Sequence, residues 1–160
     1  MPGLKVIVEP GKQNIVTRRD FDAPRELVFQ AHVDPDLIPR WWGPAKYKTV
    51  VEKLEPRTGG SWRVVSSSDD GAVFPFSGVF HEVTSPERMT QTFEFEPMAG
   101  HVSLNTATLE ELGKGRTRVI TVSTFQSVED RDGMVQSGME SGLREGYERL
   151  DALLATRISR

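Results

Sequence analysis

Cysteine is missing from this chain of 160 residues. Its absence excludes disulfide bridges, thiolate zinc sites, cysteine-ligated iron–sulfur clusters and a cysteine nucleophile. The net charge is also small, because 20 Lys and Arg residues and 23 Asp and Glu residues give a formal charge of −3. Proteins that bind nucleic acid are usually strongly basic, so we expect no nucleic-acid partner.

Long hydrophobic runs are missing as well. No stretch approaches the ~18 consecutive apolar residues that a membrane-spanning helix needs. Met1–Lys12 also lacks the charged start and apolar run of a secretory signal. We therefore expect a cytoplasmic protein with no membrane span. Apolar residues make up 37% of the chain and charged residues 27%, which predicts one globular domain over residues 1–160.

The familiar catalytic and metal-binding motifs are absent too. Ser141-Gly142 does not extend to a G-x-S-x-G elbow, and His81-Glu82 lacks the second histidine of a zinc-protease motif. The other two histidines, His32 and His101, are far from His81 in sequence. We therefore predict no catalytic residue, no metal site and no cofactor.

What the sequence does contain is a succession of β-like runs. Lys5–Val8 and Asn14–Phe21 are rich in β-branched residues, and Pro10-Gly11 between them is either a tight turn or a kink in one long edge strand. Short turn signals separate six further runs, which predicts antiparallel neighbours. These runs are Lys48–Leu54, Ser61–Ser66, Ala72–Thr84, Arg88–Glu96, His101–Glu111 and Arg116–Phe125.

Two short helices are expected after the first strand. Asp22 is placed to cap the first of them and Pro24 suits its first turn, while Asp34-Pro35 starts a second short helix through Ile38. A long C-terminal helix follows the last strand. Its start is predicted at Ser127, and Ser137-Gly138 is a candidate break within it.

The C-terminal helix carries one apolar stripe at three- and four-residue spacing. The stripe comprises Val135, Met139, Gly142, Leu143, Gly146, Leu150, Leu153 and Leu154. These elements predict an α+β fold in which a curved antiparallel sheet of about seven strands packs on one long helix. A curled sheet leaves space beneath the helix unless large side chains fill it.

Aromatic and methionine side chains are candidates for the wall of an apolar pocket in that space. Each of them has core packing as its alternative, and of two adjacent tryptophans one could serve each purpose. The candidate ligand-binding residues are Trp41, Trp42, Phe74, Phe76, Met89, Phe93, Phe95, Met139 and Leu143. The glycines at 138, 142 and 146 either allow close helix–sheet packing or leave room for a ligand.

Polar residues that could orient a ligand are few, and each could equally be a solvated surface residue. The candidates are Arg63, Glu82, Gln91 and Arg144, with Arg40 placed to stack on a neighbouring indole.

Several motifs, taken in order along the chain, resemble a known family. They are RDFDAP at 19–24, Asp34-Pro35, WWGP at 41–44, GGSWR at 59–63, FPFSGVF at 74–80, SPER at 85–88 and GMESG at 138–142. The set is similar to the bacterial, AHSA-type relatives of the activator of heat-shock chaperone ATPase, within the START-like, birch-allergen-like (SRPBCC) superfamily. Two positions depart from the family pattern: Thr58 replaces a common proline, and Gly146 replaces a larger residue.

The resemblance implies a helix-grip fold with a cavity between sheet and helix that holds lipids, sterols, polyketides or similar molecules. The leading hypothesis is therefore a non-enzymatic binding protein for a small hydrophobic or amphipathic molecule. One alternative is an enzyme of the polyketide cyclase or dehydratase type, with Glu82 or His81 as the acid or base. The other is a cofactor of a heat-shock chaperone that acts through its surface, and a homodimer is compatible with all three. The chain leaves no room for the extra chaperone-binding domain of the eukaryotic activators.

Overall fold

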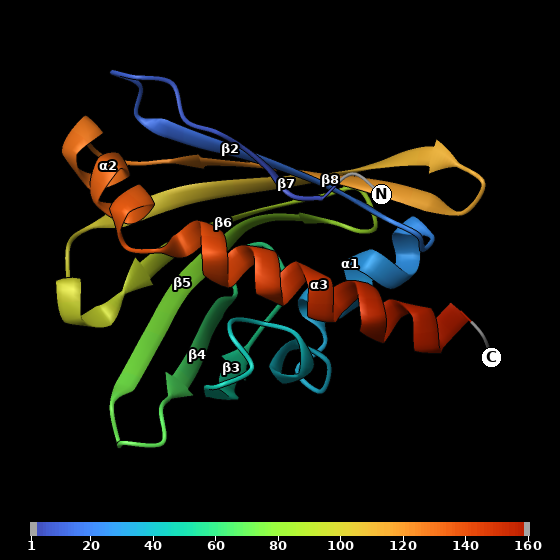
Figure 1. The fold of residues 1–160 in the computed structure, drawn as a ribbon, viewed down its shortest axis with the longest axis horizontal. Coiled ribbons are helices and arrows are strands. Elements are labelled where there is room, and N and C mark those ends of the chain that lie inside the picture. Colours follow the sequence, from blue (N-terminus) through green and yellow to red (C-terminus); the bar gives the residue numbers. More distant parts are fainter. Residues whose placement is uncertain (1–2, 159–160) are drawn as a thin grey trace.

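A single antiparallel sheet of eight strands forms the centre of the computed structural model, which describes residues 3–158 (Figure 1). The strands are β1 (Lys5–Ile7), β2 (Asn14–Phe21), β3 (Lys48–Leu54), β4 (Ser61–Ser67), β5 (Val73–Thr84), β6 (Arg88–Phe95), β7 (Val102–Gly113) and β8 (Arg116–Thr124). Their order across the sheet is β1-β2-β8-β7-β6-β5-β4-β3. The predicted α+β class and curved antiparallel sheet are confirmed, and residues 1, 2, 159 and 160 of the predicted domain lie outside the described part.

The eighth strand arises at the N-terminus. Gly11 has a φ of 78°, and the amide of Lys12 donates to the carbonyl of Glu9. This tight turn lets β1 pair antiparallel with β2, with Val6 opposite Thr17. Pro10-Gly11 is therefore a turn between two strands and not a kink in one, so the expected count of about seven is one strand short.

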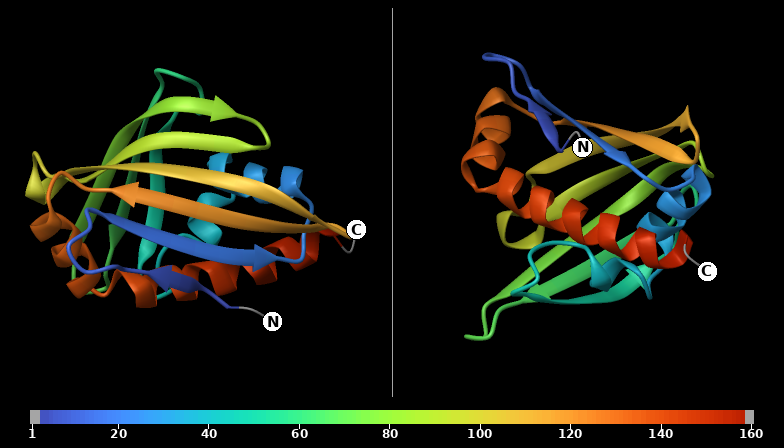
Figure 2. Two further views of the ribbon diagram at one scale, coloured as in Figure 1. Left: turned by 90° about the horizontal axis from the view of Figure 1, so that it is seen from above. Right: turned by 45° about the vertical axis from the view of Figure 1, so that its right-hand side comes forward.

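Helices cover one face and one end of the sheet. They are α1 (Arg25–Val33), α2 (Val128–Gln136) and α3 (Met139–Ile158), with two short 3-10 turns, η1 (Ile38–Arg40) and η2 (Glu96–Met98). The curved sheet wraps around α3, as the two views of Figure 2 show. This is the helix-grip arrangement that the sequence predicted.

Two expected details of the short helices are wrong. The second short helix is the 3-10 helix η1, which begins later than expected: the amides of Leu37 and Ile38 both bond to the carbonyl of Asp34 in a turn, and η1 starts only at Ile38 and ends at Arg40. Asp22 does not cap α1. Its carboxylate instead pairs with Arg116 at 3.1 Å, across the sheet.

Two predictions about the C-terminal helix are confirmed. The Ser127 hydroxyl accepts a hydrogen bond from the amide of Asp130 at 3.0 Å and caps α2. Gly138 has a φ of 87°, which side chains other than glycine rarely adopt, and it separates α2 from α3.

The apolar core has two parts. The main core packs α1 and the C-terminal half of α3 against β2, β6, β7 and β8, and it includes Phe21, Met89, Val119, Tyr147 and Leu150. The rings of Phe21 and Tyr147 meet edge to face at 5.3 Å. A second, smaller core of Trp62, Val64 and Phe80 lies on β4 and β5. Partly buried side chains adjoin both cores.

Candidate functional site

A chain of aromatic rings lies beside the second core, and we call it the aromatic cluster. Its members are Trp42, Tyr47, Trp62, Phe74, Phe76, Phe93 and Phe95. Phe76 is central, because its ring centroid lies 5.2 Å from Trp42, 5.3 Å from Phe93 and 5.2 Å from Phe95. Separations of this size are favourable for aromatic pairs.

The strand register places the five rings that lie in strands, Trp62, Phe74, Phe76, Phe93 and Phe95, on the inward face, where α3 lies. Val64 is buried in the second core, and it is opposite Phe76 in β5, which is in turn opposite Phe95 in β6. Directly cross-strand residues point to the same face of a sheet, so all three side chains point inward. Phe74 and Phe93 share this face because they are two residues away from Phe76 and Phe95.

Burial distinguishes the aromatic cluster from the main core. Trp62 is 5% exposed, but the other six rings are only half-buried. At the main core, by contrast, Phe21 and Leu150 are completely buried. The aromatic cluster therefore keeps apolar surface that the protein itself does not cover.

The nine predicted ligand-binding residues divide between core and cluster. Trp41 and Met89 are 5% and 4% exposed and belong to the main core. The indole nitrogen of Trp41 donates to the carbonyl of Ala31 at 3.0 Å, and its ring stacks on Tyr147. Trp42, Phe74, Phe76, Phe93 and Phe95 belong to the aromatic cluster. Leu143 packs half-buried against the main core, and Met139 is half-buried at the start of α3.

A row of polar side chains adjoins the aromatic cluster on the same face. Gln91 in β6 is opposite Asn105 in β7, and Asn105 is opposite Ser123 in β8. The hydroxyl of Ser103 donates to the side-chain oxygen of Asn105 at 3.0 Å. We call Gln91, Asn105 and Ser123 the polar row, and all three are half-buried. The sequence singled out Gln91 but missed Asn105 and Ser123, which only the alternation of small polar residues along β7 and β8 could have indicated.

The charged candidates lie away from the inward face. The guanidinium of Arg63 binds Glu96 at 2.9 Å and also Glu52, on the outer face of the sheet. Arg144 pairs with Glu140 within α3, and Arg40 is exposed. The sequence-based suggestion that these groups orient a ligand in the space under α3 is therefore not supported.

Glu82 and His81 do not fit the acid or base of a cyclase. Glu82 is opposite Thr90 on the outer face, and Arg88 donates to both of its carboxylate oxygens. These hydrogen bonds lower the pKa of Glu82, whereas a general acid at neutral pH needs a raised one. His81 is exposed.

Glycine serves close packing in one part of α3. A Cβ atom on Gly146 would lie 3.1 Å from the carbonyl oxygen of Trp41, so glycine lets the helix approach the loop after η1. Gly142 is less crowded, with Pro44 at 3.9 Å from the same position. Of the two interpretations of the glycine stripe, packing applies at Gly146.

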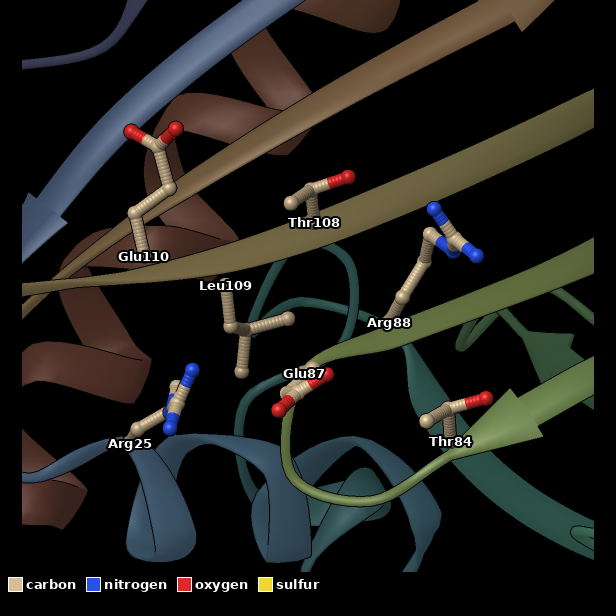
Figure 3. Close-up of a pocket in the computed structure, with 7 residues that line it drawn as sticks. All are labelled: Arg25, Thr84, Glu87, Arg88, Thr108, Leu109 and Glu110. Atoms are coloured by element: carbon tan, nitrogen blue, oxygen red, sulfur yellow. The ribbon is translucent and has the colours of Figure 1, made fainter.

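Two hollows in the surface are rich in charge, and Trp62 is the one residue of the aromatic cluster that lines either of them. One of about 300 Å³ lies where α1 approaches the β5–β6 turn and β7, and Arg25, Glu87, Arg88 and Glu110 line it (Figure 3). The other, of about 430 Å³, lies on the outer face around Arg63 and Glu96. Within residues 3–158, no three His, Asp or Glu side chains gather as a metal site would require, and no helix is long and apolar enough to cross a membrane.

The curved antiparallel sheet around a long C-terminal helix is the helix-grip architecture of START-like proteins. Residues 22–155 match the family model described as Activator of Hsp90 ATPase homolog 1-like protein. This chain belongs to that family, within the SRPBCC superfamily that the sequence motifs indicated.

Solved structures agree with this assignment. A solution structure of a protein from Arthrobacter aurescens is 30% identical, with 95% of this chain and 91% of that chain covered and a TM-score of 0.84. A crystal structure of a protein from Rhodobacter sphaeroides is 25% identical, with 96% and 98% covered and a TM-score of 0.85. The AHSA1 protein from Silicibacter pomeroyi, at 21% identity, 90% and 99% coverage and a TM-score of 0.75, shares the fold. No curated protein matches this chain.

Proposed function

We propose that this protein binds a small hydrophobic or amphipathic molecule, such as a lipid or polyketide, against the aromatic cluster between the sheet and α3. One observation carries the proposal: four of the five strand rings in the aromatic cluster are half-buried although they face inward, and the rings of Trp42 and Tyr47 that contact them are half-buried as well. Covering such surface is favourable by about 25 cal/mol per Å² of apolar area. Family membership supports a binding or cofactor role and is consistent with this proposal.

Binding without catalysis is the form of the proposal that fits these side chains. Glu82 and His81, the acid and base suggested for a cyclase, are on the outer face or exposed. The inward side chains around the aromatic cluster are aromatic, aliphatic, amide or hydroxyl groups.

A test uses an uncharged fluorescent probe, N-phenyl-1-naphthylamine, whose emission rises in apolar surroundings. We expect wild-type protein to enhance its emission in a saturable way and a lipid, polyketide or flavonoid from a panel to displace it. Native mass spectrometry of protein purified without added ligand checks for a bound species. No saturable enhancement, no displacement and no bound mass would refute the proposal.

Phe76→Ala locates the site, because the Phe76 ring contacts three other rings of the aromatic cluster. We expect it to weaken probe binding by about tenfold or more, the equivalent of about 1.4 kcal/mol. Leu104→Ala is the matched control, since Leu104 is 44% exposed and is opposite Thr92 on the outer face. Equal loss in the two variants would place the probe elsewhere.

The chaperone-cofactor alternative stays a prediction that the family description favours. It is tested by retention of the cell's own heat-shock chaperone on the immobilised protein. Homodimerisation, cytoplasmic location and the single-domain limits 1–160 are likewise predictions, which sedimentation, cell fractionation and limited proteolysis would check.

A further inference from the structure

The polar row is an unusual feature in the middle of an inward sheet face. Gln91, Asn105 and Ser123 occupy three adjacent strands at one level of the sheet. Phe93 lies two residues from Gln91 along β6, so the row begins about 7 Å from the aromatic cluster at a strand rise of about 3.4 Å per residue. A single molecule of modest size can therefore contact both groups.

The polar row also has unused hydrogen-bonding capacity. Within residues 3–158, neither the Gln91 amide nor the Ser123 hydroxyl makes a side-chain hydrogen bond, and the Asn105 oxygen receives one from Ser103. The three side chains are half-buried, so water or a ligand completes their bonding. A ligand that replaced this water with an apolar group would leave polar groups unpaired at a cost of about 1–3 kcal/mol each.

Charge is absent from this part of the inward face. At the levels of Phe95, Phe93 and Gln91, the inward side chains of β4 to β8 are all uncharged. The level of Phe95 comprises Val64, Phe76 and Phe95, and the level of Phe93 comprises Trp62, Gly78, Phe93 and Ser103. The level of Gln91 comprises Phe80, Gln91, Asn105 and Ser123.

The inward-pointing cation on β2 is Arg19, two levels farther along the sheet. It is 7% exposed and already engaged, because it packs over the Phe21 ring at 4.9 Å and approaches Asp151 at 3.7 Å. The buried cation of α2, Arg131, donates to the carbonyl of Asn14 near this row and is likewise engaged, with Asp132 at 2.8 Å. An anionic group beside the polar row would therefore be partly desolvated without a free partner charge, which is unfavourable.

We infer that the ligand is an uncharged aromatic molecule that carries hydroxyl or carbonyl groups at one end, and that the polar row binds this end while the rings stack on Phe76 and Phe93. This inference rests on the proposed function and adds ligand class and orientation. It distinguishes the ligand from a fatty acid or another anionic lipid, whose head group the site does not complement.

Three probes of one ring size test the inference: 2-naphthol, naphthalene and 2-naphthoate, which is negatively charged at pH 7. We expect 2-naphthol to bind at least about tenfold more tightly than naphthalene, as one or two satisfied hydrogen bonds would give. We expect 2-naphthoate to bind more weakly than naphthalene. Titrations followed by tryptophan quenching or calorimetry measure all three affinities.

Gln91→Met and Asn105→Leu remove the polar groups with little change in side-chain volume. Each should reduce the preference for 2-naphthol over naphthalene to about threefold or less, while the affinity for naphthalene equals or exceeds that of the wild type, because fewer polar groups are left unpaired. Naphthalene binding at least as tight as in the wild type shows that the variants are folded. Thr106→Val is the control, because Thr106 is next to Asn105 and points outward to Thr90.

Each outcome has a separate meaning. Equal affinities for 2-naphthol and naphthalene, tightest binding of 2-naphthoate, or a preference that survives in both variants would overturn the inference and leave the proposed function intact. Failure of all three probes and of N-phenyl-1-naphthylamine to bind would refute the proposed function itself.

Discussion

The two adjacent tryptophans should respond in opposite ways to the same substitution. Trp41 is 5% exposed, donates a hydrogen bond to Ala31 and contacts the rings of His32 at 4.9 Å and Tyr147 at 6.1 Å. Trp42 is half-buried, and its ring contact is with Phe76. Trp41→Phe should therefore lower stability, whereas Trp42→Phe should weaken ligand binding.

The magnitude follows from what each substitution removes. At Trp41 the lost hydrogen bond contributes about 0.5–1.5 kcal/mol, and the smaller ring leaves a void and weaker aromatic contacts, which together add about 1–2 kcal/mol. We expect a total loss of about 1.5–3.5 kcal/mol. At about 2–4 °C per kcal/mol for a chain of this size, Tm should fall by about 3–14 °C. At Trp42 we expect a loss below about 1 kcal/mol.

Thermal unfolding and probe titration on the same preparations provide the assay. Trp41→Phe should keep the affinity of the wild type for N-phenyl-1-naphthylamine at a temperature where both are folded, and Trp42→Phe should weaken it about threefold or more. The reasoning is refuted if Trp42→Phe costs as much stability as Trp41→Phe, or if Trp41→Phe is the variant that weakens binding.

Two further predictions concern stability. Gly78→Ala should destabilise the protein by more than about 2 kcal/mol, because its Cβ would lie 1.9 Å from the Thr92 carbonyl oxygen. Gly133→Ala should stabilise it by about 0.5–1 kcal/mol, because this Cβ would meet open space in α2. Urea unfolding measures both, and a Gly133→Ala variant less stable than Gly78→Ala would contradict the reasoning. Burial lowers the pKa of His32 below its ordinary value of 6.5, although the hydrogen bond of its ring with the Val28 carbonyl opposes this. The unfolded chain therefore binds a proton at His32 more readily than the folded protein does. The free energy of unfolding should decrease as the pH falls below 6.5. His32→Gln should flatten this fall in unfolding free energy between pH 7.5 and 5, and an unchanged slope would assign it to other groups.

Much of the fold could be predicted from local patterns in the chain. The six runs after residue 47 match β3 to β8 within two residues at each end, because turn residues and β-branched runs act over short distances. The cap at Ser127 and the break at Gly138 are local as well, since each depends on the conformation of one or two residues. Local patterns do not distinguish a turn from a kink at Pro10-Gly11, because β1 is a strand only through its pairing with β2.

The site was predicted less completely. Residue types correctly indicated that aromatics gather on one face, but not which of them the core would bury. Trp41 and Met89 belong to a core that α3 helps to form, and α3 is distant from both of them in sequence. Glu82 and Arg63 were candidates until the tertiary structure supplied Arg88 and Glu96 as their partners.

By itself, the sequence determined most elements of this protein, its family and the residue types of its proposed site. Only the tertiary structure decided which of Trp41 and Trp42 is core, and that Gln91, Asn105 and Ser123 form one row. The physical reason is the separation along the chain of the residues that interact. Helix caps, turns and strand alternation depend on near neighbours in sequence. Burial and cross-strand register depend instead on contacts between segments tens of residues apart, such as the pairing of Asn105 with Ser123 and the packing of Tyr147 on Trp41.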